Sequence, residues 1–271
     1  YRAQRRGGKG RAGMNTHEED FVSQVFVVNT HTPVLFFSSN GIVYKLKVYK
    51  LPLGTPQTRG KALINVLPLG EGETITTMMP LPEDEEAWGK LFVMFATASG
   101  GVRRNSLSDF SSVMANGKIA MKLKEGDKLI CVSTCTEDDD VLLSARNGKC
   151  IRFSVKDVRV FSGRTSTGVR GIKLTKGDEV IAMSVLNHVK IEVEEREAYL
   201  QAVNASRRLT GGDYTDREVD KARDEELASK LKLEPFVTMA ETEEYILTIS
   251  VDGMGKRTSA YEYRIAGRGG Q

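Results

Sequence analysis

The sequence is poor in the residues that mark disulfide-rich, metal-binding and membrane-spanning proteins. Among 271 residues there are only three cysteines and three histidines. An odd, small number of cysteines in a long chain indicates a reducing compartment rather than a disulfide framework. Cys131 and Cys135 have no second pair and no nearby histidine to complete four zinc ligands, so we expect them in a strand. No apolar run is long enough to span a bilayer, and no signal peptide is visible.

Catalytic groups are also missing as a set. His17, His31 and His188 share no motif with a nucleophile. The acidic run 137–140 lacks the spacing and the glycine of a calcium loop. We expect it and the run 82–86 to be solvated connections that hold negative charge away from the basic strands. The sequence therefore predicts no catalytic residue, no metal site and no cofactor in this chain.

Positive charge is in slight excess and unevenly placed. The net charge is +3 and the pI is about 8.6, which alone is weak evidence for a nucleic-acid partner. Acids outnumber bases by 12 to 8 in the segment 191–234, so the remainder is more basic than the average suggests. The sequence begins at Tyr1 rather than Met, and we expect it to be a fragment.

A hairpin signal occurs four times, each time with a cation at the fourth residue past its glycine. Apolar runs precede each turn, and a segment such as 42–49 alternates between two faces as a strand does. Asn-Gly and Asp-Gly are typical of two-residue hairpin turns. The turns are Asn40-Gly41, Ser99-Gly100, Asn147-Gly148 and Asp252-Gly253, and their cations are Lys45, Arg104, Arg152 and Arg257.

A second signature follows in the same order. The segment 117–130 is repeated at 168–181, and a looser version runs from 60 to 75. Its last glycines, Gly72, Gly126 and Gly177, are 54 and 51 residues apart. A period near fifty with four strands per unit indicates a propeller-like all-β fold. A plain β-sandwich with coincidental turns is the alternative.

The period is interrupted once, by a segment with a helical pattern. Gly148 and Gly253 are 105 residues apart, and the excess is the segment 191–234. Gly211-Gly212-Asp213 breaks its pattern, and Thr215–Glu218 resembles a capping box that opens a second helix through Leu231. We interpret it as a solvated helical hairpin inserted in a surface loop, although a partner-binding or autoinhibitory element would share the pattern. The expected division is 1–16 lead-in, 17–80, 81–135 and 136–190 as three blades, 191–234 insertion and 235–271 partial fourth blade.

The repeated cations suggest a track for a polyanion. Phosphate contacts by Lys and Arg give affinity that is independent of sequence. Aromatic residues are sparse beside these cations, and no helix is placed to enter a major groove, so double-stranded DNA held by its backbone fits best. Ordinary solubilising residues are the alternative for any single cation. The candidates are Lys45, Lys47, Arg59, Lys61, Arg103, Arg104, Lys118, Lys149, Arg152, Arg164, Arg170, Lys256 and Arg257.

The heptad Gln4-Arg5-Arg6-Gly7-Gly8-Lys9-Gly10 resembles the box motif that marks the C-terminal domain family of bacterial DNA gyrase A. Segments 37–44, 167–174 and 255–258 are similar to the same family, and the resemblance covers nearly all of the chain except 191–234. The resemblance implies a β-pinwheel, in which four-stranded blades exchange strands, with about two further blades after Gln271. It also implies a basic rim that wraps DNA and a latching role for Gln4 through Gly10.

In the family, the wrapped DNA is presented as the transported segment for negative supercoiling. The resemblance thus implies a bacterial cytoplasmic, nucleoid-associated complex of gyrase A with gyrase B, whose ATP, Mg and cleavage tyrosine lie outside this chain. The equivalent domain of topoisomerase IV lacks a proper box, so the intact heptad favours gyrase. A propeller that binds other proteins is an alternative from another class. A propeller enzyme would need convergent titratable residues, and the sequence shows none.

Overall fold

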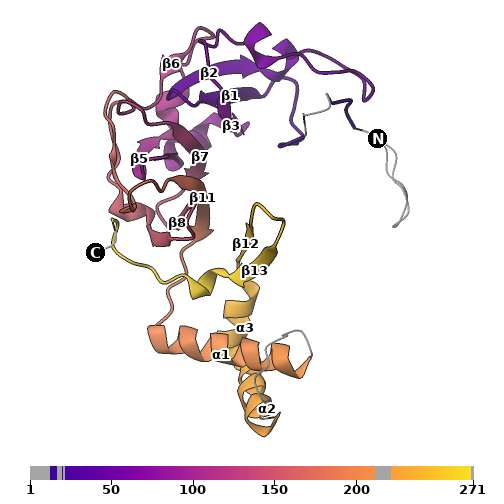
Figure 1. The fold of residues 1–271 in the computed structure, drawn as a ribbon, viewed down its shortest axis with the longest axis vertical. Coiled ribbons are helices and arrows are strands. Elements are labelled where there is room, and N and C mark those ends of the chain that lie inside the picture. Colours follow the sequence, from indigo (N-terminus) through magenta and orange to yellow (C-terminus); the bar gives the residue numbers. More distant parts are fainter. Residues whose placement is uncertain (1–12, 17–19, 21, 211–220, 270–271) are drawn as a thin grey trace.

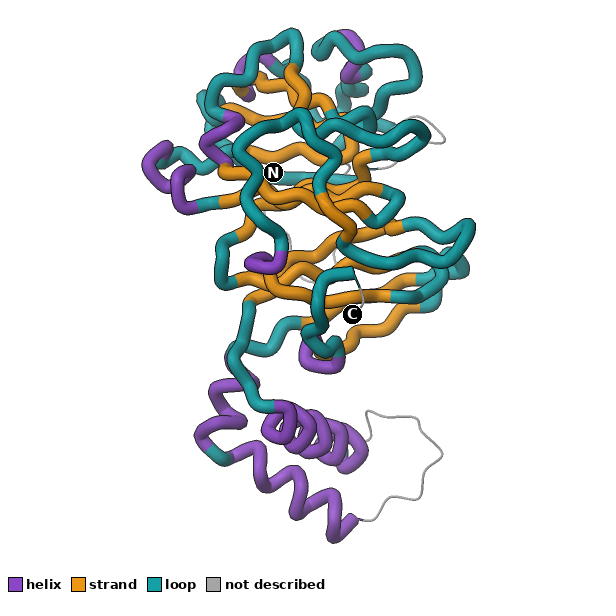
Figure 2. Tube along the Cα trace, turned by 90° about the vertical axis from the view of Figure 1, so that its left-hand side faces the viewer, coloured by secondary structure: helices purple, strands orange, loops and turns teal. Residues whose placement is uncertain are grey.

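The computed structural model describes residues 13–16, 20, 22–210 and 221–269. Its strands form four antiparallel units that follow one another along an arc, and a group of helices lies beyond the third unit (Figure 1). Seen from the side, the sheets are stacked and the helices project from one end of the stack (Figure 2). The predicted all-β pinwheel with a helical insertion is confirmed. None of the described helices is long and apolar enough to cross a membrane.

Each unit is built on one of the four predicted hairpins. Glycine at each turn has a positive φ, between 77° and 84°, which residues with a Cβ rarely adopt. The hairpins pair β1 (Pro33–Ser38) with β2 (Ile42–Lys47), β4 (Phe92–Thr97) with β5 (Gly101–Ser106), β8 (Asp139–Ala145) with β9 (Cys150–Ser154), and β12 (Tyr245–Ile249) with β13 (Gly255–Ser259).

A third strand adds to the first strand of each of three hairpins. These strands are β3 (Ile75–Pro80), β7 (Leu129–Cys135) and β11 (Val180–Asn187). They also touch one another: Val132 N donates to Thr77 Oγ1 at 3.2 Å, and Cys131 Sγ donates to Met183 O at 3.8 Å. Both Cys131 and Cys135 lie in β7, as predicted.

Strand exchange completes two of the sheets. The short strand β6 (Lys118–Ile119) follows the second hairpin in sequence but pairs with β2 of the first unit, and β10 (Val169–Arg170) of the third unit pairs with β5 of the second. The sheet orders are β3–β1–β2–β6 and β10–β5–β4–β7; among the described residues the third sheet is β11–β8–β9 and the fourth is β12–β13.

The second sequence signature is the segment that carries each exchanged strand. We call residues 117–123 the first strap and 168–174 the second strap. Each strap runs under the hairpin turn of the preceding unit: Gly41 O accepts from Ala120 N at 2.8 Å, and Gly100 O accepts from Gly171 N at 2.8 Å. The approach is so close at Gly168 (φ 76°) that a Cβ would lie 2.3 Å from Val102 O.

The apolar core runs from unit to unit. Phe37 of the first unit meets Phe95 and Phe110 of the second at ring-centroid distances of 5.7 and 5.9 Å. A second cluster joins Met94 and Val102 to Val141 and Phe153 of the third unit. Because these side chains are fully buried, adjacent units share one packed interior.

The helices form a small module of their own. They are α1 (Val193–Leu209), α2 (Lys221–Ser229) and α3 (Glu234–Glu241), so the helical segment extends past the predicted limit at 234. The predicted capping box at 215–218 lies outside the described residues. Short 3-10 turns complete the chain at Val48–Lys50, Leu63–Asn65, Glu85–Lys90, Leu107–Phe110, Val155–Asp157, Lys230–Lys232 and Ala260–Glu262.

Candidate nucleic-acid interface

The four equivalent cations do not share one outward orientation. Arg104 and Arg152 are each only 5% exposed, Lys45 is half-buried, and Arg257 is exposed with its guanidinium 4.5 Å from the Tyr245 ring centre. The expectation of one solvent-facing row is therefore wrong for Arg104 and Arg152. The side chains of Arg104 and Arg152 instead make contacts within the protein, to Glu137 and to Asp140 respectively.

Arg103, next to Arg104, is also an interior residue. Its Nε donates to Asn105 Oδ1 at 2.8 Å, and its Nη1 donates to the carbonyls of Arg164 and Ser166 at 2.8 and 2.6 Å. Burial lowers the pKa of Arg103 to about 10, and nearby Asp109 opposes that shift. The side chain thus holds the loop that leads into the second strap.

The equivalent position contacts the segment that arrives from the next unit. Lys45 Nζ donates to Ser111 O. The carbonyl of Arg104 accepts from Phe161 N at 2.8 Å, and the carbonyl of Arg152 accepts from Ala266 N at 2.8 Å. This position thus contacts the next unit in each case, through the side chain of Lys45, the backbone carbonyl of Arg104, and both the carbonyl and the side chain of Arg152.

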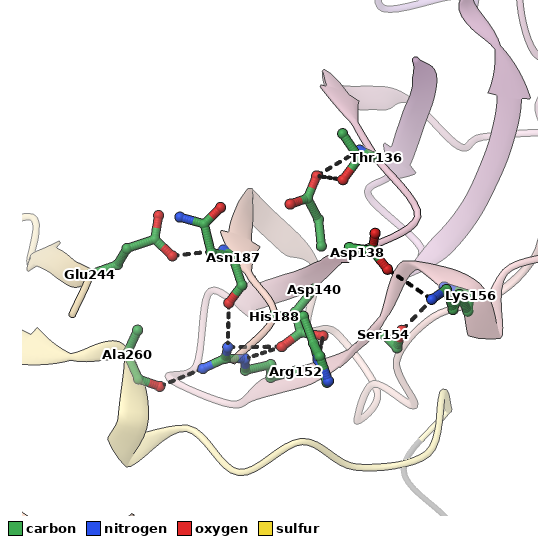
Figure 3. A network of polar contacts seen from close by, with 11 residues as sticks. Thr136, Asp138, Asp140, Arg152, Ser154, Lys156, Asn187, His188, Glu244 and Ala260 are labelled. Carbon is green, nitrogen blue, oxygen red and sulfur yellow. Dashed lines mark hydrogen bonds and ion pairs between the residues drawn. The ribbon is translucent and has the colours of Figure 1, made fainter. Parts of the chain in front are cut away.

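A buried ionic network surrounds Arg152 (Figure 3). Its Nη2 and Nε lie 2.8 and 2.9 Å from Asp140 Oδ2, and Nη1 donates to Ala260 O at 2.8 Å. Asp140 Oδ1 is 2.9 Å from His188 Nδ1. The carboxylate of Asp140 is fully buried, so the arginine beside it offsets the cost of removing that charge from water.

The acidic run does not keep away from the basic residues. Glu137 lies 3.7 Å from Arg104 Nη1, and Asp138 accepts from Lys156 Nζ at 2.9 Å. This hydrogen bond lowers the pKa of the exposed Asp138 carboxyl and raises the pKa of Lys156. The predicted separation of charge along each repeat is wrong for residues 137–140, because three of these acids pair with cations.

The remaining candidate cations are accessible. Arg164 is half-buried and donates to Asp109 O at 3.1 Å. The exposed candidates are Lys47, Arg59, Lys61, Lys118, Lys149, Arg170, Lys256 and Arg257. Gln4, Arg5, Arg6, Gly7, Gly8, Lys9 and Gly10 lie outside the described residues.

Accessible cations from different segments line hollows between units. Lys118 of the first strap and Arg164 line one hollow. Lys122, Lys124 and Arg170, from the two straps and the residue after the first, line another. A third lies between the third hairpin and the fourth and is lined by the cations Arg146, Lys149 and Lys256.

Sequence reasoning missed Lys122 and Lys124 as site residues. Lys122 occupies the same place in the first strap as Lys173 in the second, and both are exposed. The repeated lysine of the straps could have been found in the sequence, but the repeated cations of the hairpins are easier to see. The straps, rather than the fourth residue past each turn, present the repeated accessible charge.

The described residues form neither a metal-type cluster nor a cysteine pair. No group of three or more His, Cys, Asp or Glu side chains there could hold a metal ion. The three cysteines are free thiols, and burial raises the pKa of each of them, to about 12 for Cys135.

Comparison with known proteins gives a consistent result. The family described as "DNA gyrase C-terminal domain, beta-propeller" matches residues 1–29, 32–82, 92–135, 139–187 and 244–271, which are the units without the helical module. The DNA gyrase A protein of Granulibacter bethesdensis is 51% identical over the whole chain, and that of Rickettsia bellii is 50% identical. The chain spans about 30% of the length of these curated relatives.

Two solved structures share the fold. One, "Structure of DNA gyrase A C-terminal domain", has a TM-score of 0.62 at 21% identity and covers 100% of this chain and 69% of its own. The other, "Crystal structure of the C-terminal domain of DNA topoisomerase IV", has a TM-score of 0.59 at 17% identity. The match covers 90% of this chain and 58% of the topoisomerase IV chain. The family match extends over most of the chain, and this chain belongs to the DNA gyrase C-terminal domain family.

Proposed function

We propose that the chain binds double-stranded DNA through its phosphates and wraps it along the arc of units. The observation that carries this proposal is the grouping of accessible cations from consecutive segments in the hollows between units. Phosphate contacts spaced along a curved surface can offset the cost of bending, about 1–6 kcal/mol for a 20–30 bp site. The family match supports the same function.

The proposed contact set differs from the one expected from sequence alone. Arg103, Arg104 and Arg152 are excluded because their guanidinium groups are buried and engaged in the protein. Lys122, Lys124 and Lys173 are added because they are exposed on or beside the straps. The other exposed candidates are retained.

The test is a triple variant, Lys122→Ala, Lys124→Ala and Arg170→Ala, which removes the cations of one hollow. Each lost phosphate contact is expected to reduce the slope of log K against log salt by about 1, so the slope falls by about 3. Fluorescence anisotropy with a labelled duplex, titrated at several salt concentrations, measures both affinity and slope.

The matched control removes the same charge from the helical module, with Lys221→Ala, Lys230→Ala and Lys232→Ala. This module carries more acids than bases, so the control should keep the wild-type slope. Equal losses in both triple variants would show only a dependence on net charge and would overturn the proposed contact set. A wild-type chain with no salt-dependent affinity would instead favour a protein-interaction module.

At the level of the whole protein, we propose that the wrap presents a transported segment for negative supercoiling. The partners are then the rest of gyrase A, together with gyrase B, in a heterotetramer in the bacterial cytoplasm and on the nucleoid. In this proposal the catalytic residues, ATP and Mg belong to other parts of the complex. The equivalent role in topoisomerase IV is the rival, and the supercoiling direction of reconstituted enzyme separates the two.

The box is proposed to latch the wrap rather than to provide most of the affinity. Replacing Arg5, Arg6 and Lys9 by alanine should then reduce supercoiling by reconstituted enzyme more than it reduces DNA binding. Equal losses in the two assays would contradict a latching role.

A further inference from the structure

The described residues cover the fourth hairpin less completely than they cover the three earlier hairpins. Leu35, Met94, Leu142 and Leu247 lie opposite the four equivalent cations in the hairpin register. The first three are at most 1% exposed, whereas Leu247 is 68% exposed. Among the described residues, no side chain covers the outer half of the β12–β13 hairpin at Leu247.

The turn ends of these two units are separated by a groove. Gly148 and Ile181 line it from the third unit, and Ile249 and Met254 line it from the hairpin. In the earlier units the corresponding space is crossed by a strap that bonds to the turn glycine. The described contacts that hold the fourth hairpin are therefore those at its opposite end.

The opposite end of the hairpin is fastened to the helical module at both of its strands. Tyr199 of α1 and Tyr245 of β12 both donate to Glu243 Oε2, at 3.0 and 2.6 Å. Beyond β13, Tyr261 OH donates to Met239 O of α3 at 3.0 Å. The Tyr261 ring is 5.7 Å from that of Tyr199 and is buried in the core of the module.

The same end is pinned to the third unit by polar contacts. Asn187 N, at the end of β11, donates to Glu244 Oε2 at 2.7 Å (Figure 3). Arg152 Nη1 donates to Ala260 O, and Arg152 Nη2 donates to Asn187 O at 3.2 Å. Val189 and Ile191, in the connection out of β11, pack into the core of the module. Module, hairpin and third unit thus meet around Arg152.

We propose that the helices α1, α2 and α3, joined through Tyr261, are a rigid spacer that sets the angle of the β12–β13 hairpin against the third unit. The spacer thereby sets the direction in which duplex DNA leaves the third unit, and this second step rests on the proposed function. Tyr261 and Arg152 are positioning residues, since both are buried and bonded within the protein. The module is a working part of the wrap and not a tolerated insertion.

The first measurement needs no DNA. Spin labels are placed at Lys149→Cys and Asp252→Cys, on the two turns, in a Cys150→Ser background, and pulsed EPR gives their distance distribution. The parent should show one narrow distribution, and Tyr261→Ala should broaden it. Tyr49→Ala, which changes an exposed tyrosine of the first unit, is the control and should leave it narrow.

A milder variant separates positioning from misfolding. Tyr261→Phe keeps the aromatic ring and removes only the hydroxyl contacts to Met239 O and Thr242 Oγ1, so the module stays folded by far-UV circular dichroism. A smaller broadening is expected for this variant. An unchanged distribution in both Tyr261 variants would overturn the spacer.

The second measurement reads the path of the DNA. Relaxed plasmid bound by the chain is resealed with a nicking-closing enzyme, and the change in linking number per bound chain is compared with affinity for a short linear duplex. Tyr261→Ala should lower the linking-number change by about half while short-duplex affinity stays within about twofold, because a short duplex needs no bend. A broadened distance with an unchanged linking number would overturn the role in the DNA path. If the unsubstituted chain bound neither the plasmid nor the short duplex, the proposed function would be overturned. The distance measurement would still test the spacer, because it needs no DNA.

Discussion

Removing the carboxylate of Asp140 is expected to destabilise the third unit more than any exposed charge change. The carboxylate is fully buried and contacts Arg152 at 2.8 and 2.9 Å and His188 at 2.9 Å. Asp140→Ala leaves a buried guanidinium without its counterion, and breaking a buried pair in this way costs about 3–5 kcal/mol. With a urea m-value near the upper end of about 1–3 kcal/mol/M, the unfolding midpoint should fall by roughly 1–2 M.

The matched control is Arg146→Ala, which breaks an ion pair to Glu179 whose side chains are 65% and 41% exposed. An exposed pair contributes about 0–1 kcal/mol, so its urea midpoint should hardly move. Urea titrations followed by far-UV circular dichroism compare the two variants. Similar shifts for Asp140→Ala and Arg146→Ala would refute the argument that burial makes this pair structural. The double variant Asp140→Leu with Arg152→Met should be more stable than Asp140→Leu alone.

Three further outcomes are expected. Gly168→Ala should destabilise the protein more than Gly177→Ala. Both glycines have φ near 80°, so either alanine suffers the left-handed strain of about 1–2 kcal/mol. Only the Cβ at position 168 would also clash with a backbone atom, the carbonyl oxygen of Val102, and calorimetry compares the two variants. Burial and Glu73 raise the pKa of the Tyr44 hydroxyl from 10.0 to about 12. The hydroxyl therefore stabilises the wild-type fold fully below pH 10, and this contribution is lost as the pH rises from 10 to 12. In urea titrations the stability difference between wild type and Tyr44→Phe should be constant below pH 10 and shrink between pH 10 and 12. In mass-spectrometric alkylation at neutral pH, exposed Cys150 should react first, since the thiols in β7 are more buried; simultaneous labelling of all three would indicate an open second unit.

The fold could be predicted because its signals are local and repeated. Gly41, Gly100, Gly148 and Gly253 adopt the positive φ of two-residue hairpin turns, and the short turn motifs around them are visible in the sequence. Alternating apolar residues then determine which face of each hairpin is buried. The strap repeat was equally visible at 117–123 and 168–174. The strands with which the two straps pair, β2 and β5, could not be predicted from the repeat. Pairing between units depends on contacts that sequence spacing does not encode.

The site was harder to predict because one residue type serves two purposes. Arg104 and Arg152 recur at the same place as Lys45, and a repeated cation on a hairpin indicates either a surface track or an interior contact. The deciding facts are the partners of the two side chains: Glu137 and the Phe92 ring for Arg104, and Asp140 with Ala260 for Arg152. Asp140 lies in an acidic run that looks solvated, and only its position in β8 makes it an interior counterion.

The exchanged strands have a consequence for how the chain is made. The first sheet lacks its edge until β6 has been synthesised, some seventy residues after β2, and the second sheet waits in the same way for β10. A ribosome that releases the chain from its N-terminus therefore delivers each sheet unfinished, with an open edge available to any other unpaired strand. Cutting the chain between β5 and β6 would remove a strand from the sheet before the cut. Cloning boundaries placed at the apparent limits of a repeat would leave the preceding sheet with an unpaired edge, which is a site for aggregation.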